Sequence, residues 1–156
     1  EDYILRQIQT VLEAEAPISR SLLCKRVLNS WGISRLGSRI DTYFNELFNK
    51  VTYYRKIDGE SIFFWRSEEQ MISYDTFRPV SERTALDLPP DEVANAMRYL
   101  LRSQISLPTN DLSRITAQLF GFTRTGNIVD YAMRKGIREA IERGYMKVEN
   151  GRAIIL

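Results

Sequence analysis

The sequence predicts a mainly α-helical protein with small β-hairpins, an α+β fold made of two copies of one structural unit. Residues 31–44 read WGISRLGSRIDTYF and residues 120–133 read FGFTRTGNIVDYAM, so matching residues lie 120 − 31 = 89 positions apart. A repeat at a constant offset indicates a repeated structural unit. In each copy, apolar residues at helical spacing are followed by a hairpin turn signal, Asp58-Gly59 in the first and Asn150-Gly151 in the second.

Three helices are expected at the start of the first copy. Residues 3–13 carry apolar side chains at helical spacing. Ser19 is a favourable N-cap for a second helix that ends near Gly32, and Ser34 is the expected N-cap of the third helix. The positions of the third helix predicted to face inward are Leu36, Ile40, Tyr43, Phe44, Leu47 and Phe48.

The second copy repeats this pattern after the sequence PPDE at residues 89–92, which is helix-start chemistry. Residues 108–119 are expected to form its second helix, Thr123 to cap its third, and residues 145–148 and 152–156 to form a hairpin. The two turn glycines are 151 − 59 = 92 residues apart, which predicts a longer third helix in this copy. The positions of that helix predicted to face inward are Ile128, Val129, Ala132, Met133, Ile137, Ala140 and Ile141.

Three helices followed by a hairpin is the element order of a winged helix-turn-helix domain. The short turn between the second and third helices contains glycine, as that motif prefers. The sequence therefore predicts a tandem winged helix-turn-helix protein, with a first domain at 1–66, a linker at 67–90 and a second domain at 91–156. Trp31 and Phe120, each just before a turn glycine, are expected to be buried in equivalent positions.

The first hairpin, with strands expected at 51–57 and 61–65, carries aromatic residues on both faces: Tyr53, Tyr54, Phe63, Phe64 and Trp65. Consecutive strand residues point to opposite faces, and only one face can meet the hydrophobic core. The other face is therefore predicted to be an interface, which Tyr74 or Phe77 of the linker is expected to cover.

Missing residue types exclude several classes of function. The chain of 156 residues has no His and one Cys. Without histidine there are no His-based triads and no His metal sites, and no P-loop pattern occurs. Cys24 cannot form an internal disulfide, and as a small apolar residue within a helix it is expected in the core. We therefore expect no catalytic residue, no cofactor and no metal site in this chain.

Charge and hydropathy bear on partners and location. A formal net charge of +2 is not the strongly basic balance of an obvious nucleic-acid-binding protein. There is no signal peptide and no apolar run of about 18 residues, which predicts a cytoplasmic protein without membrane contact. The chain begins at Glu1 rather than Met, which suggests a fragment of a longer protein.

The outward faces of the two predicted third helices carry residues that suit DNA contact. Arg, Asn, Ser and Lys reach phosphates and base edges from a helix in the major groove. The outward stripe of the first copy is Ser38, Thr42, Asn45 and Asn49, with Arg35 and Arg39 beside it and Arg55 and Lys56 near the hairpin tip. The candidate DNA-binding residues of the second copy are Asn127, Tyr131, Arg134, Lys135, Arg138 and Arg124. A solvated amphipathic helix without a ligand would show the same polar stripe.

The sequence resembles a known family over about residues 8–156. The segments that carry the resemblance are EAPIS, LL and RV, then WGISRLGSRI, a hairpin, LPPDEV, FGFTRTG and a final GR strand. The family is an uncharacterised C-terminal domain of large bacterial superfamily 1 helicase-like proteins, many of which carry a predicted restriction-type nuclease module. The resemblance implies a parent protein with an ATP-driven motor that acts on DNA. Ile128, which stands where the first copy has Arg39, departs from the pattern and leaves the second motif without one basic residue.

These observations predict a non-catalytic accessory module that binds duplex or forked DNA with little sequence preference, chiefly through the second copy, beside the helicase and nuclease parts of a parent protein. The alternative is a protein-interaction module, because winged helices also serve as rigid docking surfaces and a fold does not determine a function. The near-neutral charge and the aromatic hairpin favour the alternative. The outward stripe of the second copy and the resemblance favour DNA.

Overall fold

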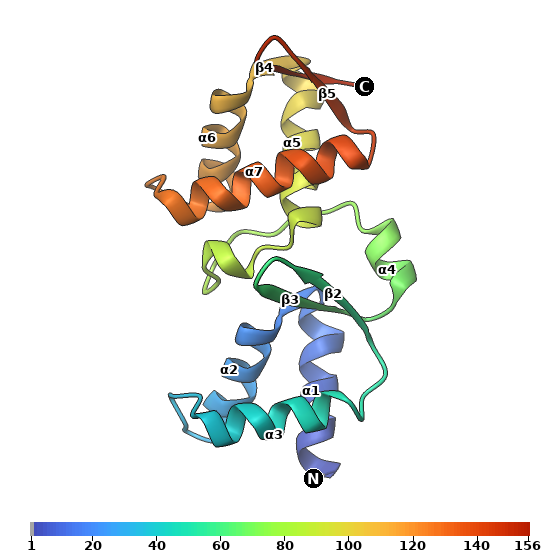
Figure 1. Cartoon of the computed structure of the whole chain (residues 1–156), viewed down its shortest axis with the longest axis vertical. Helices are drawn as coiled ribbons and strands as arrows, with labels where there is room; N and C mark the ends of the chain where they lie inside the picture. The colour runs from blue at the N-terminus through green and yellow to red at the C-terminus, as the bar shows by residue number, and fades with distance from the viewer. Residues whose placement is uncertain (1) are drawn as a thin grey trace. The chain divides into compact units, whose positions relative to one another are not determined.

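The computed structural model in Figure 1 describes residues 2–156. These residues form an α+β structure with seven α-helices, one short 3₁₀ helix and two three-stranded antiparallel sheets. The chain divides into two compact units, the first ending at Ser73 and the second beginning at Tyr74. Among residues 2–156, no helix is both long enough and apolar enough to cross a membrane.

The first unit consists of α1 (Asp2–Glu15), β1 (Ile18–Ser19), α2 (Arg20–Ser30), α3 (Ser38–Phe48), β2 (Tyr54–Asp58), β3 (Ser61–Trp65) and α4 (Glu68–Ser73). Its sheet has the order β1-β3-β2, so the central strand β3 pairs on both sides. Within this unit, α3 runs across α1 and α2, and the hairpin of β2 and β3 lies at one end of these two helices (Figure 1). The core between them includes Ile8, Leu23, Phe44, Leu47 and Phe64, all at most 1% exposed.

The second unit consists of η1 (Ala85–Asp87), α5 (Pro90–Gln104), β4 (Ser106–Pro108), α6 (Thr109–Phe120), α7 (Asn127–Glu142), β5 (Met146–Glu149) and β6 (Arg152–Ile155). Its sheet has the order β4-β6-β5. The second and third helices start at the offset of the repeat, since 109 − 20 = 89 and 127 − 38 = 89. α7 has 16 residues and α3 has 11, which confirms the longer third helix expected from the spacing of the turn glycines.

Local signals in the sequence account for where several helices begin and end. The Oγ atom of Ser19 accepts a hydrogen bond of 3.1 Å from the backbone N–H of Leu22, as expected for the N-cap of α2. Gly32 has a φ of +73°, the left-handed conformation that favours glycine beyond a helix end. The sequence predicts the two hairpin strands of each sheet but not the additional strands β1 and β4. These have two and three residues, which are too few for a periodic pattern. Their pairing with β3 and β6 makes them strands.

The predicted starts of the third helices are wrong. The N-caps of α3 and α7 are Gly37 and Gly126, without a side-chain capping hydrogen bond, rather than Ser34 and Thr123. The preceding residues remain in a loop, so Leu36 is 40% exposed instead of facing inward. Of the other positions predicted to be inward, those that are also exposed are Tyr43 at 37%, Ile128 at 55% and Ile141 at 45%.

The buried residues of α7 are three small residues, one methionine and one lysine: Ala132, Met133, Lys135, Gly136 and Ala140. A Cβ atom at Gly136 would lie 2.8 Å from the Cβ of Val93 on α5, closer than real Cβ contacts. The glycine therefore allows α7 and α5 to approach each other.

Replacing Gly136 with Ala is expected to lower the free energy of unfolding by about 1–3 kcal/mol, the usual cost of overpacking a core. Urea denaturation of the two proteins would measure the difference. Gly144→Ala is the comparison variant. A Cβ atom at Gly144 meets no atom within 4 Å, so any loss of stability there comes from the backbone φ of +75° and not from overpacking. A Gly136→Ala protein as stable as the original would show that α5 and α7 are not in close contact.

Residues 67–90, expected to be a linker, make contacts with the units to which they belong: the part up to Ser73 with the first unit and the part from Tyr74 with the second. The side chain of Gln70 in α4 donates a 3.0 Å hydrogen bond to the carbonyl of Ala16. In the second unit, the ring of Phe77 lies 5.9 Å from that of Phe120. The expectation that Tyr74 or Phe77 covers the first hairpin stays a prediction. Phe120 is 1% exposed, whereas Trp31 is half-buried.

Candidate nucleic-acid interface

The exposed face of α7 carries the polar stripe predicted from the sequence. Asn127, Tyr131, Arg134 and Arg138 are all exposed and recur every three or four residues, so they follow one side of a helix with 3.6 residues per turn. The side chain of Arg134 is 65% exposed, and Tyr131 is 45% exposed. α7 therefore presents two arginines, an amide and an aromatic ring over three turns.

Lys135 does not belong to this exposed stripe. The prediction that it points outward with Arg134 and Arg138 is wrong, because Lys135 is only 8% exposed. Its Nζ atom lies 4.6 Å from the centre of the Tyr131 ring, at the distance of a cation–π contact. Lys135 is therefore placed to hold the Tyr131 ring rather than to meet a ligand itself.

Ion pairing of the exposed arginines in the second unit is weak. Arg134 pairs with Asp130 at 3.2 Å, but both side chains are more than half exposed, and such pairs contribute little stability. Arg124 and Arg138 are exposed, and no carboxylate among residues 2–156 forms an ion pair with either. These three guanidinium groups can therefore meet an external anion at little cost.

The loop before each third helix carries an exposed arginine at the same place in the repeat. Arg35 and Arg124 are 124 − 35 = 89 residues apart, and both lie in the loop rather than in the helix. Arg39 and Ser38, at the start of α3, are also exposed. The structure thus places Arg35, Ser38 and Arg39 together at one end of α3.

In the first unit, a side chain of α2 binds the third helix, α3, and the second unit has a different residue at that position. The guanidinium group of Arg20 donates hydrogen bonds to the Oδ1 atom of Asp41 at 2.6 Å and to the Oδ1 atom of Asn45 at 2.8 Å. It also lies 5.4 Å from the centre of the Phe48 ring. Thr109 occupies the position of Arg20 in the second unit. The polar stripe of α3 is therefore partly used for its own packing.

A groove lies beside the loop before the third helix in each unit. It has a volume of about 220 Å³ in the first unit and about 290 Å³ in the second. Lys25 and Arg114 line the two grooves at equivalent positions, since 114 − 25 = 89, and both are exposed. The sequence reasoning missed these two basic residues. Applying the repeat offset to every basic residue would have found them.

The first hairpin does not present its basic residues at the tip. Arg55 and Lys56 pair with Phe64 and Phe63 in the middle of the strands, and the turn itself contains Gly59. The expectation that Arg55 and Lys56 lie near the tip, where a phosphate backbone would meet them, is therefore wrong.

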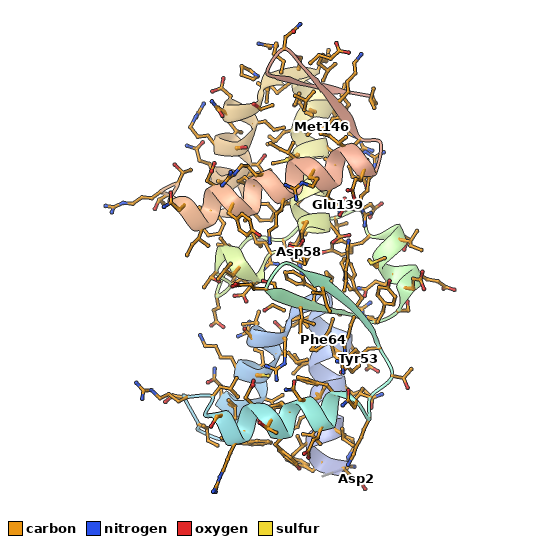
Figure 2. All side chains as sticks on the ribbon, viewed as in Figure 1. Asp2, Tyr53, Asp58, Phe64, Glu139 and Met146 are labelled. Carbon is orange, nitrogen blue, oxygen red and sulfur yellow. The ribbon has the colours of Figure 1, made fainter. Side chains whose placement is uncertain are left out.

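Arg55 is instead engaged with its own unit. It donates a 3.2 Å hydrogen bond to the Oδ1 atom of Asn49 and another of 3.2 Å to the hydroxyl of Tyr53. Tyr53 and Phe64 lie beside each other, with ring centres 4.7 Å apart (Figure 2). Phe63, Phe64 and Trp65 are at most 1% exposed, so these three residues form no open aromatic patch.

Cys24, the cysteine of α2, is buried at 1% exposure. Burial raises the pKa of its thiol to about 11, so the group stays protonated at neutral pH. A protonated buried thiol is neither a nucleophile nor a metal ligand. Within residues 2–156, no cluster of three or more His, Cys, Asp or Glu residues is arranged to hold a metal ion.

Residues 1–42 match the model of a family described as a protein of unknown function, DUF3320. The match ends within α3 and so includes α1, β1, α2 and the loop that carries Arg35. No curated protein and no solved structure matches the chain. The description of the matching family assigns no activity to it.

Proposed function

We propose that the chain is a non-catalytic DNA-binding module composed of two winged helix-turn-helix domains, and that the second domain makes the main contact. The observation that carries this proposal is the exposed stripe of α7, formed by Asn127, Tyr131, Arg134 and Arg138. The element order of each unit, three helices with a three-stranded sheet whose last two strands form a hairpin, supports the winged-helix assignment.

The chemistry of the stripe suits a helix placed against duplex DNA. Arg134 and Arg138 would bind phosphates, and Asn127 at the helix start would reach base edges or the sugar–phosphate backbone. Arg124 precedes the helix and would bind a phosphate at its N-terminus, where the helix dipole also favours an anion. In the first domain Arg35, Ser38 and Arg39 would make a smaller contact of the same kind.

The balance of charge limits the strength of this contact. Asp130 and Glu142 are exposed on the same helix and reduce the positive potential of the stripe. Binding is therefore weak and depends little on base sequence, as expected where phosphate contacts dominate. Such binding suits an accessory module attached to a motor that holds DNA by itself. The resemblance to helicase-like proteins supports that placement, with duplex or forked DNA as the ligand.

The proposal predicts a measurable salt dependence. Contacts from Arg124, Arg134 and Arg138 to three phosphates give a slope of about −2.7 for the logarithm of the binding constant against the logarithm of salt concentration, at about −0.9 for each contact. Fluorescence anisotropy with a labelled duplex and a labelled fork, between low and moderate salt, would measure the slope. The absence of salt-dependent binding to either DNA would contradict the proposal.

A further inference from the structure

In the second unit, residues 74–83 form a segment without helix or strand that ends in a turn at Ser81; this segment, here called the strap, lies over α5 and α6. The ring of Phe77 lies 5.4 Å from that of Tyr99 on α5 and 5.9 Å from that of Phe120 at the end of α6. The backbone N–H of Val80 donates a 2.8 Å hydrogen bond to the carbonyl of Phe120. The strap therefore fills the outer groove between the first and second helices of its unit.

Polar groups of α5 hold the backbone of the strap. The side-chain amide of Asn95 donates hydrogen bonds to the carbonyls of Tyr74 and Thr76, at 3.1 and 2.9 Å. Asn95 is 3% exposed, and both hydrogen bonds are partly buried. A donor on the first helix thus binds two carbonyls of an extended chain, which is a contact that does not depend on the side chains of the strap.

The strap is also fixed by charge. Glu92 on α5 is 0% exposed and accepts hydrogen bonds from Arg78 at 2.8 Å and from Arg83 at 2.7 Å. Burial opposes ionisation of Glu92, but the two arginines outweigh burial and lower the pKa of its carboxyl. The charge of the groove is therefore matched by opposite charges on the strap.

The equivalent groove of the first unit lies between α1 and α2 and has a volume of about 540 Å³. Its position corresponds to that of the strap site, because Tyr3, Arg6 and Thr10 of the lining stand 89 positions before Glu92, Asn95 and Tyr99. No segment among residues 2–156 fills it. The residues that line it are Tyr3, Arg6, Gln7, Thr10, Val11, Arg26, Val27 and Ser30.

This groove offers the same kinds of contact as the strap site. Trp31 stands at the position of Phe120, directly after the lining residue Ser30, and is half-buried, so its exposed part can receive an aromatic ring. Its Nε1–H donates a 2.9 Å hydrogen bond to Gln7 in the groove wall. Arg6 stands at the position of Asn95 and can likewise donate to backbone carbonyls.

The charge of the groove is opposite to that of the strap site. Its charged lining residues are Arg6 and Arg26, whereas the strap site holds the carboxylate of Glu92. Arg26 pairs with Glu15 at 3.2 Å. Arg6 is exposed, and no ion pair joins it to any of residues 2–156. An occupant of this groove is therefore complemented by a carboxylate within reach of Arg6, which stands at the position of Asn95, about one helical turn from the position of Glu92.

We propose that the α1–α2 groove binds an extended peptide segment that carries an aromatic side chain and a carboxylate. The aromatic ring packs against Trp31, as Phe77 packs against Phe120, and Arg6 binds backbone carbonyls and the carboxylate. The groove is a second interaction surface on the first unit and does not depend on DNA binding by α7.

The test uses a synthetic peptide with the sequence of residues 74–80 in which Arg78 is replaced by Glu, acetylated and amidated at its ends. It is titrated into the full chain labelled with ¹⁵N. The indole N–H signal of Trp31 and the amide signals of residues 3–11 and 26–31 are expected to shift in a saturable manner, with a dissociation constant of about 1 mM or lower. The indole signal of Trp65, which is 0% exposed, provides an internal reference.

Two charge reversals separate groove binding from general attraction. Arg6→Glu is expected to weaken binding about fivefold, in line with the range for exposed charge pairs, and Lys25→Glu on the other side of α2 is expected to leave it unchanged. Equal weakening by both variants would overturn the proposal. So would shifts confined to α5 and α6, or groove shifts that appear with rising protein concentration alone, since the latter would identify a second copy as the occupant.

Discussion

Replacing Arg124, Arg134 and Arg138 together with Glu is expected to abolish DNA binding. Through counterion release, each phosphate contact contributes about eightfold to affinity at 0.1 M salt relative to 1 M, so the loss of three contacts amounts to about five hundredfold. The three side chains are exposed, so the fold should not change. Fluorescence anisotropy with a labelled duplex measures the loss, and circular dichroism checks the fold.

A single substitution provides the matched control. Arg138→Glu should weaken binding, whereas Arg102→Glu, an equal charge change at an exposed residue of α5, should have little effect. Reversal of Arg35 and Arg39 should weaken binding less than the triple variant, because part of the polar stripe of α3 is used by Arg20. A triple variant that keeps its affinity at low salt would exclude the α7 face as the DNA contact and favour the protein-docking alternative.

Replacing Glu92 with Ala is expected to lower the free energy of unfolding by about 3–5 kcal/mol, the usual cost of removing one partner from a buried charge pair. Glu92 is 0% exposed, and its partner Arg83 has a side chain only 9% exposed, so Arg83 would keep a buried charge with backbone carbonyls as acceptors but without the carboxylate of Glu92. Guanidinium denaturation measures the loss. Limited proteolysis should then cut within the strap, because Arg78 and Arg83 would no longer hold it.

Glu142→Ala is the control for this variant, because Glu142 is an exposed acid on α7 and should change stability by no more than about 0.5 kcal/mol. The ion pair of Glu92 with Arg83 also predicts that the free energy of unfolding depends on pH. The pKa of Glu92 is lowered from its ordinary value of 4.5 in the folded state, so its contribution is present above that value and is lost as the pH falls through the lowered pKa. Equal stability of the Glu92→Ala and Glu142→Ala proteins would contradict the buried network.

The two units share an order of elements but differ in what covers them. Arg20 binds Asp41 and Asn45 in the first unit, whereas Thr109 stands at that place in the second and leaves the α7 stripe to solvent. Conversely, the strap fills the outer helix groove of the second unit, and the first unit lacks an equivalent among residues 2–156. We therefore infer a division of roles, with DNA contact on the second unit and peptide docking on the first.

Features governed by short-range chemistry could be predicted from the sequence. The exposed positions of α7 follow from helical periodicity, because residues three or four apart share one face. The cap at Ser19 and strand β3 follow from residue preferences that act within a few positions. The offset of 89 likewise pairs Arg35 with Arg124 from the sequence alone.

Features that depend on contacts between distant residues were decided only by the tertiary structure. Lys135 lies at the edge of the polar stripe, where periodicity does not determine exposure, and it is buried beside Tyr131. Strands β1 and β4 exist because a distant strand pairs with them. The strap has no period of its own, and its place on α5 and α6 depends on Phe77 and on the buried carboxylate of Glu92. In each case the free energy comes from partners far along the chain, which a local pattern does not contain.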